Sequence, residues 1–139
     1  MAEATGLSLA TGYVLKFAAG RERPDQTTDP NEWRTAGSSF PSLHATAAFA
    51  IGTVFAESGG GDYRWLTRFI GYGIAVATSY ERLDHNAHWL SDVVAGAGLG
   101  DSSAVFVLNR TYGRDGGAQI GLAPIDGGGL LLTYRMTVD

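Results

Sequence analysis

Residues 41–56 read PSLHATAAFAIGTVFA, and the fold class follows first from this stretch. Proline ahead of an apolar run is typical of a helix start, because its fixed φ suits the first helical turn. Ser39 or Ser42 could act as the N-cap. The run from Ala45 to Ala56 holds no charged residue, which is typical of a buried helix. We therefore expect this segment to form a helix inside an all-α bundle.

Three further segments have helical character. Residues 6–20 carry apolar side chains at helical spacing, and Pro24 should close that helix. Residues 63–80 predict a second apolar helix with Arg64 and Arg68 on its exposed side. The last helix should run from an N-cap at Asn86 to about Asn109. Between the first two helices, the polar stretch 25–40 predicts a loop long enough to suggest a function.

The C-terminal part has a different character. Glycines mark a break at 113–117, and the apolar runs 119–124 and 130–138 flank Asp126 and three glycines. Asp-Gly between two apolar runs is a hairpin signal. We expect a helical domain at 1–112, which carries the candidate catalytic residues, followed by a glycine-rich linker and a small C-terminal β-hairpin at 113–139.

Composition excludes several classes of protein. The formal net charge of -4 argues against a nucleic-acid partner, and the absence of cysteine excludes disulfides, thiolate metal sites and a cysteine nucleophile. A membrane-spanning helix needs about 18 consecutive apolar residues. The apolar runs are shorter and predict buried helices: Ala45 to Ala56, Phe69 to Tyr80 and Val93 to Gly100. The first residues also lack the basic start of a signal peptide.

The first segment with chemical potential contains Lys16 and Arg23. They are seven residues apart, so they would share one face if the helix continued through both. Two cations on one face, followed by Pro24, suit an anionic ligand. The alternative is a solvated basic helix end, which would also interact favourably with the helix dipole.

The second segment is the start of the helix that begins near Pro41. Ser42, Leu43 and His44 would lie in its first turn, where unpaired backbone N–H groups attract anions. A cation is disfavoured at that end of a helix, so His44 is unusual as a purely structural residue.

The third segment contains Arg82, His88 and Asp92. His88 and Asp92 are four residues apart on a predicted helix and would be neighbours on one face. A carboxylate beside an imidazole fixes its tautomer and raises its basicity, which suits a nucleophile or a base. Two alternatives remain open: a metal site that adds Asp84 and His85, or an incidental His–Asp pair at a charged helix start.

Together, the three segments resemble the type 2 phosphatidic acid phosphatase superfamily, which includes bacterial acid phosphatases, lipid phosphatases and vanadium haloperoxidases. The pattern of that family is K-x6-RP, then PSGH, then SR-x5-H-x3-D. The matching residues, in the same order and with the same spacing within each motif, are Lys16, Arg23, Pro24, Pro41, Ser42, His44, Arg82, His88 and Asp92. The resemblance covers about residues 10–108 and implies a helical bundle.

The sequence departs from the family pattern at two motif positions. Leu43 replaces a glycine that lets a backbone N–H approach phosphate closely, and Glu81 replaces a serine. Family members also have helices ahead of the first motif, which begins here at residue 16. The resemblance thus implies that an N-terminal part of the family's bundle is missing from this sequence.

The resemblance assigns a role to each matching residue. His88 would attack phosphorus and form a phosphohistidine, Asp92 would orient His88, and His44 would protonate the leaving alcohol and then activate water. The phosphoryl oxygens would be held by Lys16, Arg23, Ser42, the N–H of Leu43 and Arg82. No cofactor is implied, and vanadate would act as a phosphate mimic.

The expected function is a metal-independent phosphatase of phosphate monoesters, either lipid phosphates or small soluble ones. Alternatives are a vanadate-dependent haloperoxidase, a non-catalytic or truncated phosphate-binding domain, and a metal hydrolase. The resemblance implies a periplasmic or membrane-associated location at the outer face, and it leaves a homodimer open.

Overall fold

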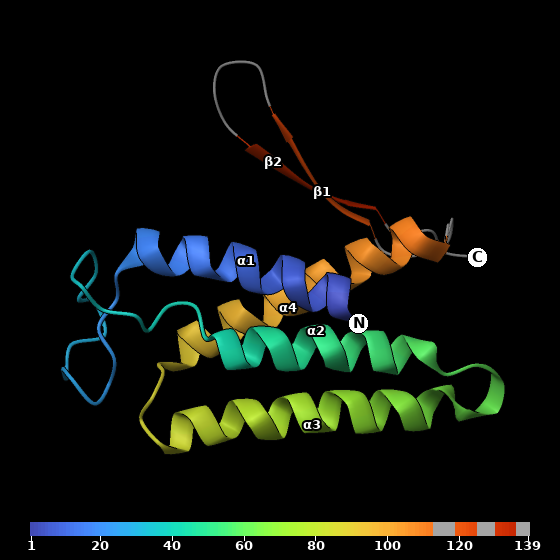
Figure 1. Cartoon of the computed structure of the whole chain (residues 1–139), viewed down its shortest axis with the longest axis horizontal. Helices are drawn as coiled ribbons and strands as arrows, with labels where there is room; N and C mark the ends of the chain where they lie inside the picture. Colours follow the sequence, from blue (N-terminus) through green and yellow to red (C-terminus); the bar gives the residue numbers. More distant parts are fainter. Residues whose placement is uncertain (113–118, 125–129, 136–139) are drawn as a thin grey trace.

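The computed structural model describes residues 1–112, 119–124 and 130–135, with side chains described as far as residue 111. Its helices are α1 (Ala2–Ala19), α2 (Leu43–Ser58), the 3-10 helix η1 (Gly61–Tyr63), α3 (Arg64–Asp84) and α4 (Leu90–Tyr112). Figure 1 shows the four long helices packed along one another. The predicted all-helical bundle is therefore confirmed for residues 1–112.

The predicted C-terminal hairpin is represented by two strands, β1 (Gln119–Pro124) and β2 (Leu130–Arg135). They pair antiparallel, with Gln119 opposite Arg135 and Pro124 opposite Leu130. The glycine-rich linker and the turn predicted at Asp126 to Gly129 lie outside the described residues. The separation of this segment from the helical unit stays a prediction.

Helix α2 is the centre of the bundle. It packs extensively against both α3 and α4, while α1 contacts α4 and α2 and the contact between α3 and α4 is small. In Figure 1, α2 lies between α3 on one side and α1 and α4 on the other. The apolar stretch 41–56 thus provides the surface on which the other three helices assemble.

The interior of the bundle is built from small side chains. Six alanines are fully buried, and Thr46 and Thr53 are among the largest side chains that are fully buried. Small residues allow helix backbones to approach closely, so that dispersion contacts between backbones replace interdigitating large side chains. The buried apolar residues are Ala4, Ala45, Ala50, Ala56, Ala75, Val93, Ala104 and Val107.

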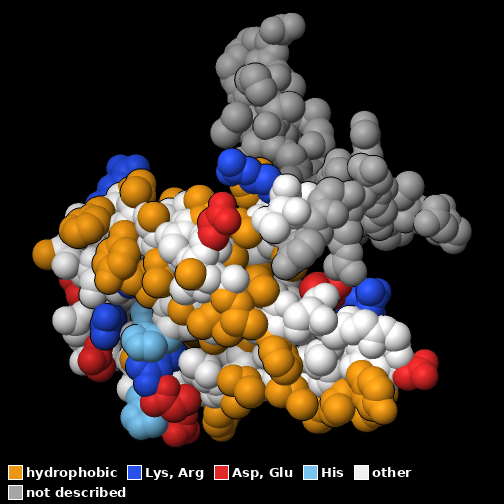
Figure 2. Space-filling model, turned by 45° about the vertical axis from the view of Figure 1, so that its right-hand side comes forward, with side chains coloured by type: hydrophobic (Ala, Val, Ile, Leu, Met, Phe, Trp, Pro, Cys, Tyr) orange, Lys and Arg blue, Asp and Glu red, His pale blue; other side chains and the backbone are white. Residues whose placement is uncertain are grey.

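Many large apolar side chains lie on the surface instead. Figure 2 shows orange apolar side chains over much of one face of the molecule. Phe17 is 85% exposed and Phe69 is 75% exposed, and apolar side chains gathered on one face are typical of a surface that contacts lipid or protein. The exposed large apolar residues of the helices include Tyr13, Val14, Phe17, Trp65, Phe69, Ile74, Val76, Leu90, Val94 and Phe106.

Helix α1 ends within one residue of the predicted range 6–20, but Gly20 and not Pro24 terminates it, and it begins earlier, at Ala2. Gly20 has a φ of 52° and caps the helix by donating its N–H to the Lys16 carbonyl. A Cβ at this position would lie 2.4 Å from the Thr35 carbonyl oxygen, so both the conformation and the space require glycine. The chain therefore turns away from the helix axis before it reaches Arg23.

Helix α4 begins later than predicted. Asn86 is not its N-cap; it has a φ of 50° and lies in the segment between α3 and α4. Asparagine tolerates this left-handed conformation better than most residues, because its short side chain bonds locally. His88 therefore precedes α4 instead of belonging to its first turn, which corrects the sequence-based placement.

Helix α4 is also the exception to the expectation that no apolar run could cross a membrane. Residues Leu90–Thr111 form a 22-residue helix that is long and apolar enough to do so, and 39% of the apolar window is buried inside the bundle. The expected apolar run, Val93 to Gly100, stops before Asp101, whereas the helix continues through this carboxylate into the apolar residues that follow it. Core helices of soluble proteins can have the same length and composition.

Two glycines of α4 provide a test of this close packing. A Cβ on Gly100 would lie 2.2 Å from the Thr46 carbonyl oxygen, whereas a Cβ on Gly98 would meet nothing within 4 Å. Gly100→Ala should destabilise the protein by about 1–3 kcal/mol through overpacking. Gly98→Ala should stabilise it by up to about 1 kcal/mol through helix propensity. Urea unfolding followed by circular dichroism measures both, and equal effects of the two variants would contradict the packing described.

Candidate active site

The three sequence motifs meet at one end of the bundle. Helices α1 and α3 end there, and helices α2 and α4 begin there (Figure 1). In the rotated view of Figure 2, histidine side chains lie among basic and acidic side chains at the lower left of the molecule. The fold brings to this end all the predicted site residues: Lys16, Arg23, Ser42, Leu43, His44, Arg82, His88 and Asp92.

The carboxylate of Asp92 is the most enclosed charged group of this site. Its side chain is 0% exposed. Oδ1 lies 2.5 Å from the Arg21 guanidinium, while Oδ2 accepts hydrogen bonds from Ser39 Oγ at 2.5 Å and from the Trp89 N–H at 2.9 Å. Burial by itself raises the pKa of this carboxyl, but His88, Ser39, the Trp89 N–H and Arg21 outweigh burial and lower the pKa below its ordinary value. Asp92 is therefore held as an anion in the protein interior.

His88 lies beside this carboxylate. Its Nδ1 is 3.8 Å from Asp92 Oδ2, and the residue is 5% exposed. Among the described residues, Nδ1 has no hydrogen-bond partner. The Asp92 carboxylate is thus close to Nδ1 but beyond hydrogen-bond distance. The predicted proximity of His88 and Asp92 is correct, although the segment ahead of α4, and not a shared helix face, produces it.

Lys16 and Arg23 approach each other around the turn at Gly20, and not along one helix face as the sequence suggested. The Lys16 ammonium donates a hydrogen bond to the Ser38 carbonyl. Burial and the charge of Arg23 lower the pKa of Lys16 to about 8, with a smaller opposing influence from Asp92. A cation destabilised in this way favours a nearby anion, which would restore its ordinary pKa.

His44 lies in the first turn of α2 and is exposed. Its pKa is lowered by partial burial, and then by the charges of Arg82, His88 and Arg23, against an opposing effect of Glu81. These influences come from α3, from the segment before α4 and from the loop after α1. His44 therefore faces the same cationic region as the other motif residues.

Ser42 and Leu43 form the turn into α2. Ser42 is the N-cap, with its side chain 3.4 Å from the Ala45 N–H, and its own N–H donates to the Asp92 carbonyl at 3.0 Å. The Leu43 side chain packs towards α1, since a Cβ on Gly12 would lie 2.6 Å from Leu43 Cδ2. Gly12 thus provides room for Leu43, the residue that stands where the family motif has a glycine.

Arg82 is engaged by its neighbour. Its Nε lies 2.6 Å from a carboxylate oxygen of Glu81, and one of its terminal nitrogens binds the same oxygen. This hydrogen bond lowers the pKa of Glu81. The motif arginine, with a side chain 24% exposed, is therefore paired with the acidic residue that stands at the serine position of the motif.

The described residues do not support the alternative metal site. Asp84 and His85 are exposed, whereas Asp92 is buried with both oxygens occupied. In the part of the chain that the structure describes, no three His, Asp or Glu side chains are close enough to share a metal ion. The His85 ring pairs instead with Glu81.

The sequence did not predict the three groups that contact the Asp92 carboxylate, which are Arg21, Ser39 and the Trp89 N–H. Arg21 lies inside the variable x6 stretch of the first motif, where no pattern marks it. For Ser39 the sequence predicts only an N-cap, whereas its hydroxyl donates to Asp92 Oδ2. A charged residue in an apolar environment would have been the signal, but burial is visible only in the folded chain.

Asp92→Asn tests the importance of this network for stability. At pH 7 the variant should lose about 3–5 kcal/mol of unfolding free energy, because Arg21 stays buried without its counter-ion. The lowered pKa means that the Asp92 contribution exists above its unfolded pKa and disappears as pH falls through the folded value. The difference in unfolding free energy between Asp92→Asn and wild type, measured by urea unfolding, should thus become smaller below about pH 4.

The matched control is Asp84→Asn, which changes an exposed carboxylate at the same end of the bundle and should alter stability by about 0.5 kcal/mol at most. Two results would show that the network does not hold this end together. One is an Asp92→Asn variant as stable as wild type at pH 7. The other is a difference in unfolding free energy that stays constant down to pH 3.

Comparisons with known proteins agree with this geometry. Residues 1–115 match the family described as the PAP2 superfamily. A lipid A 1-phosphatase from Porphyromonas gingivalis is 37% identical over 102 residues, which make up 72% of this chain and 21% of that protein. The chain therefore spans only a small part of this relative's length. No solved structure matches the chain significantly.

The family match covers the whole helical part, and it contains all three motifs in the order and spacing of the resemblance. The described helices bring those motifs together at one end of the bundle. The resemblance seen in the sequence is confirmed, and the chain belongs to the PAP2 superfamily.

Proposed function

We propose that this chain carries the catalytic site of a metal-independent phosphatase that hydrolyses phosphate monoesters through a phosphohistidine. The observation that carries the proposal is the meeting of a buried His88–Asp92 pair with Lys16, Arg23 and His44 at one end of the bundle. Family membership supports the same reaction class.

The first step transfers the phosphoryl group to the protein. Asp92, an anion beside Nδ1, keeps the proton of the His88 ring on that nitrogen, so that the lone pair of Nε2 can attack phosphorus. A phosphorus–nitrogen bond forms, and the bond from phosphorus to the ester oxygen breaks. Protonated His44 donates its proton to the leaving oxygen, and its lowered pKa makes it the stronger acid for this purpose.

The second step regenerates the protein. Neutral His44 takes a proton from water as the water oxygen attacks phosphorus. The phosphorus–nitrogen bond breaks, and inorganic phosphate leaves with the new oxygen. The lowered pKa favours the neutral form of His44 that this step requires.

The cations of the site supply most of the remaining stabilisation. A phosphoryl transition state spreads charge over three equatorial oxygens, so catalysis depends on positioning and on electrostatics. We assign this role to Lys16, Arg23 and Arg82, with the helix start at Ser42 and Leu43 as a further anion-binding element. Arg82 must exchange part of its pairing with Glu81 for the phosphate, which makes its contribution weaker than that of an unpaired arginine.

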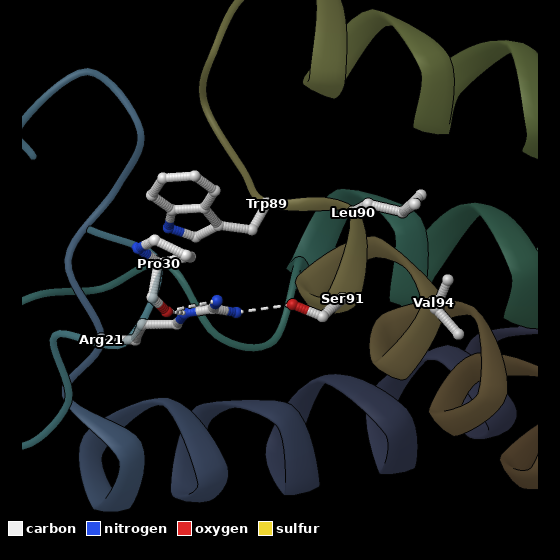
Figure 3. Close-up of a pocket in the computed structure, with 6 residues that line it drawn as sticks. All are labelled: Arg21, Pro30, Trp89, Leu90, Ser91 and Val94. Carbon is white, nitrogen blue, oxygen red and sulfur yellow. Dashed lines mark hydrogen bonds between the residues drawn. The ribbon is translucent and has the colours of Figure 1, made fainter. Parts of the chain in front are cut away.

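The substrate we propose is a phosphate monoester on a lipid. Its support is the similarity to a lipid A 1-phosphatase, together with the exposed apolar side chains of the described helices. A pocket of about 540 Å³ borders the site and is lined partly by Trp89, Leu90 and Val94 (Figure 3). Such a wall suits the apolar part of a substrate more than a free sugar phosphate.

A location at the outer face of a membrane follows as part of the same proposal. Helix α4 has the length and composition of a membrane-crossing helix, and Phe17 and Phe69 are among the apolar side chains exposed on α1 and α3. Covering these side chains with lipid or with further protein would remove a large cost of contact with water.

His88→Ala tests the nucleophile. Turnover of an aryl phosphate should fall at least about 1000-fold, because neither residual binding nor the cations can replace the attacking nitrogen. His85→Ala is the matched control: it removes an exposed histidine three residues away and should leave turnover within about twofold. Release of the aryl alcohol, followed by absorbance, measures both variants.

The same assay separates the alternatives. Activity should survive EDTA, and vanadate should inhibit by mimicking the five-coordinate state. Loss of activity in EDTA would refute the metal-free route, and substantial turnover by His88→Ala would refute the phosphohistidine. Bromide oxidation that depends on added vanadate would instead favour the haloperoxidase alternative.

Lys16 should make phosphate binding depend on pH. Its pKa of about 8 means that the unliganded site loses a positive charge as pH rises through 8. Affinity for inorganic phosphate should then fall by up to about tenfold per pH unit between pH 8 and 9.5. Lys16→Arg stays charged there and should show a much flatter profile. Calorimetric titration gives the affinities, and parallel profiles for the two proteins would exclude Lys16 from the phosphate site.

A further inference from the structure

Arg21 occupies a site built around its guanidinium group. The residue is 4% exposed. Its Nε and one terminal nitrogen donate to the Pro30 carbonyl at 3.0 and 2.6 Å, and the other donates to Ser91 Oγ at 2.7 Å and to Asp92 Oδ1 at 2.5 Å. Figure 3 shows the guanidinium between the Pro30 carbonyl and the Ser91 hydroxyl, with the Trp89 ring nearby.

Two aromatic rings further restrict the guanidinium. Its central carbon lies 4.5 Å from the centroid of the Trp33 ring and 5.5 Å from that of Trp89. Cation–π attraction stabilises a planar cation in such a position, and a lysine ammonium cannot reproduce both the planar contact and the fork of donors. The side chain is therefore fixed in orientation as well as in charge.

The position of Arg21 determines which oxygen of Asp92 faces His88. Arg21 binds Oδ1, so the carboxylate cannot rotate without losing this ion pair. Oδ2 is left to Ser39, the Trp89 N–H and the Nδ1 of His88. All the described hydrogen bonds of Arg21 end on Pro30, Ser91 and Asp92, so none of them reaches a residue that is proposed to bind phosphate.

We propose that Arg21 is a positioning residue for the phosphohistidine reaction, which holds Asp92 so that its second oxygen can orient His88. The kinetic part of this inference rests on the proposed function. Arg21 also borders the pocket of Figure 3, but its described hydrogen bonds all end on protein groups, so it acts on the reaction through Asp92. It also fastens the loop at Pro30 to the start of α4, because its donors bind both segments.

The charged groups around Asp92 define what removal of Arg21 would change. Arg21 faces the carboxylate from the loop after α1, Lys16 acts on it from α1 itself, and His88 approaches it from the segment before α4. Loss of Arg21 removes the cation in direct contact, so Asp92 should retain a proton to higher pH. A protonated Asp92 can no longer polarise His88.

The experiment compares Arg21→Met and Arg21→Lys with wild type in aryl phosphate hydrolysis. We expect kcat to fall about 10–100-fold in Arg21→Met, as for other residues that orient a functional ligand, while KM changes by less than about twofold. The acidic limb of the pH profile should move to higher pH in Arg21→Met. Arg21→Lys keeps the charge, so its acidic limb should stay close to that of wild type while kcat is still reduced.

The matched control is Arg68→Met, which removes an arginine from an exposed ion pair with Glu57 at the other end of α2 and α3. It should leave kcat, KM and the pH profile unchanged. If Arg21→Met does not fold by circular dichroism, Ser91→Ala serves instead, because it removes one acceptor of the guanidinium and leaves Asp92 in place. Ser91→Ala should then lower kcat several-fold at constant KM.

A second readout is independent of activity. The nitrogen-15 signals of the His88 ring, identified by their loss in His88→Ala, should shift in Arg21→Lys and not in Arg68→Met. An inactive wild type whose His88 signals respond to Arg21→Lys would refute the proposed function and keep the positioning role. An active wild type with unchanged kcat, pH profile and His88 signals in the Arg21 variants would refute the positioning role alone.

Discussion

The buried carboxylate of Asp92 is the constraint on which the rest of this end of the molecule depends. An anion that is 0% exposed must be compensated, and the chain does so with groups from three separate segments: Arg21, Ser39 and the Trp89 N–H. Each of these contacts fixes a piece of backbone. The loop after α1, the approach to α2 and the start of α4 are held together by a charge that lies beside His88, so stability and the proposed chemistry depend on the same carboxylate.

Small side chains make this arrangement possible. Glycine and alanine along α2 and α4 let the two helix starts approach closely enough for the Ser42 N–H to reach the Asp92 carbonyl at 3.0 Å. The same choice moves large apolar side chains to the outside, where Phe17 and Phe69 remain exposed. Close helix contact and an apolar exterior are thus two consequences of one composition, and both suit a bundle surrounded by lipid or by further protein.

Much of the fold was predictable, and the errors have a common origin. The four helices follow from apolar periodicity, which is a local property of the chain. The way the helices end followed less well: α1 stops close to the predicted residue 20, but through Gly20 and not Pro24, and Asn86 precedes α4 without capping it. These ends depend on contacts such as the return of Thr35 to the Gly20 carbonyl, which no local pattern encodes. The site residues follow from motif order and spacing. The shared helix face expected for Lys16 and Arg23 was wrong, and so was the one expected for His88 and Asp92.

The amino-acid sequence specifies which groups are present and in what order: the cations of the first motif, the helix start at Ser42, and a His88–Asp92 spacing that matches the family pattern. Which of these groups are buried, and what each one contacts, depends on the folded chain. There Arg21 pairs with Asp92, Glu81 pairs with Arg82, and Leu43 packs against Gly12. Burial changes the energy of a charge by several kcal/mol, and it depends on residues that are distant in the chain, so no local pattern encodes it.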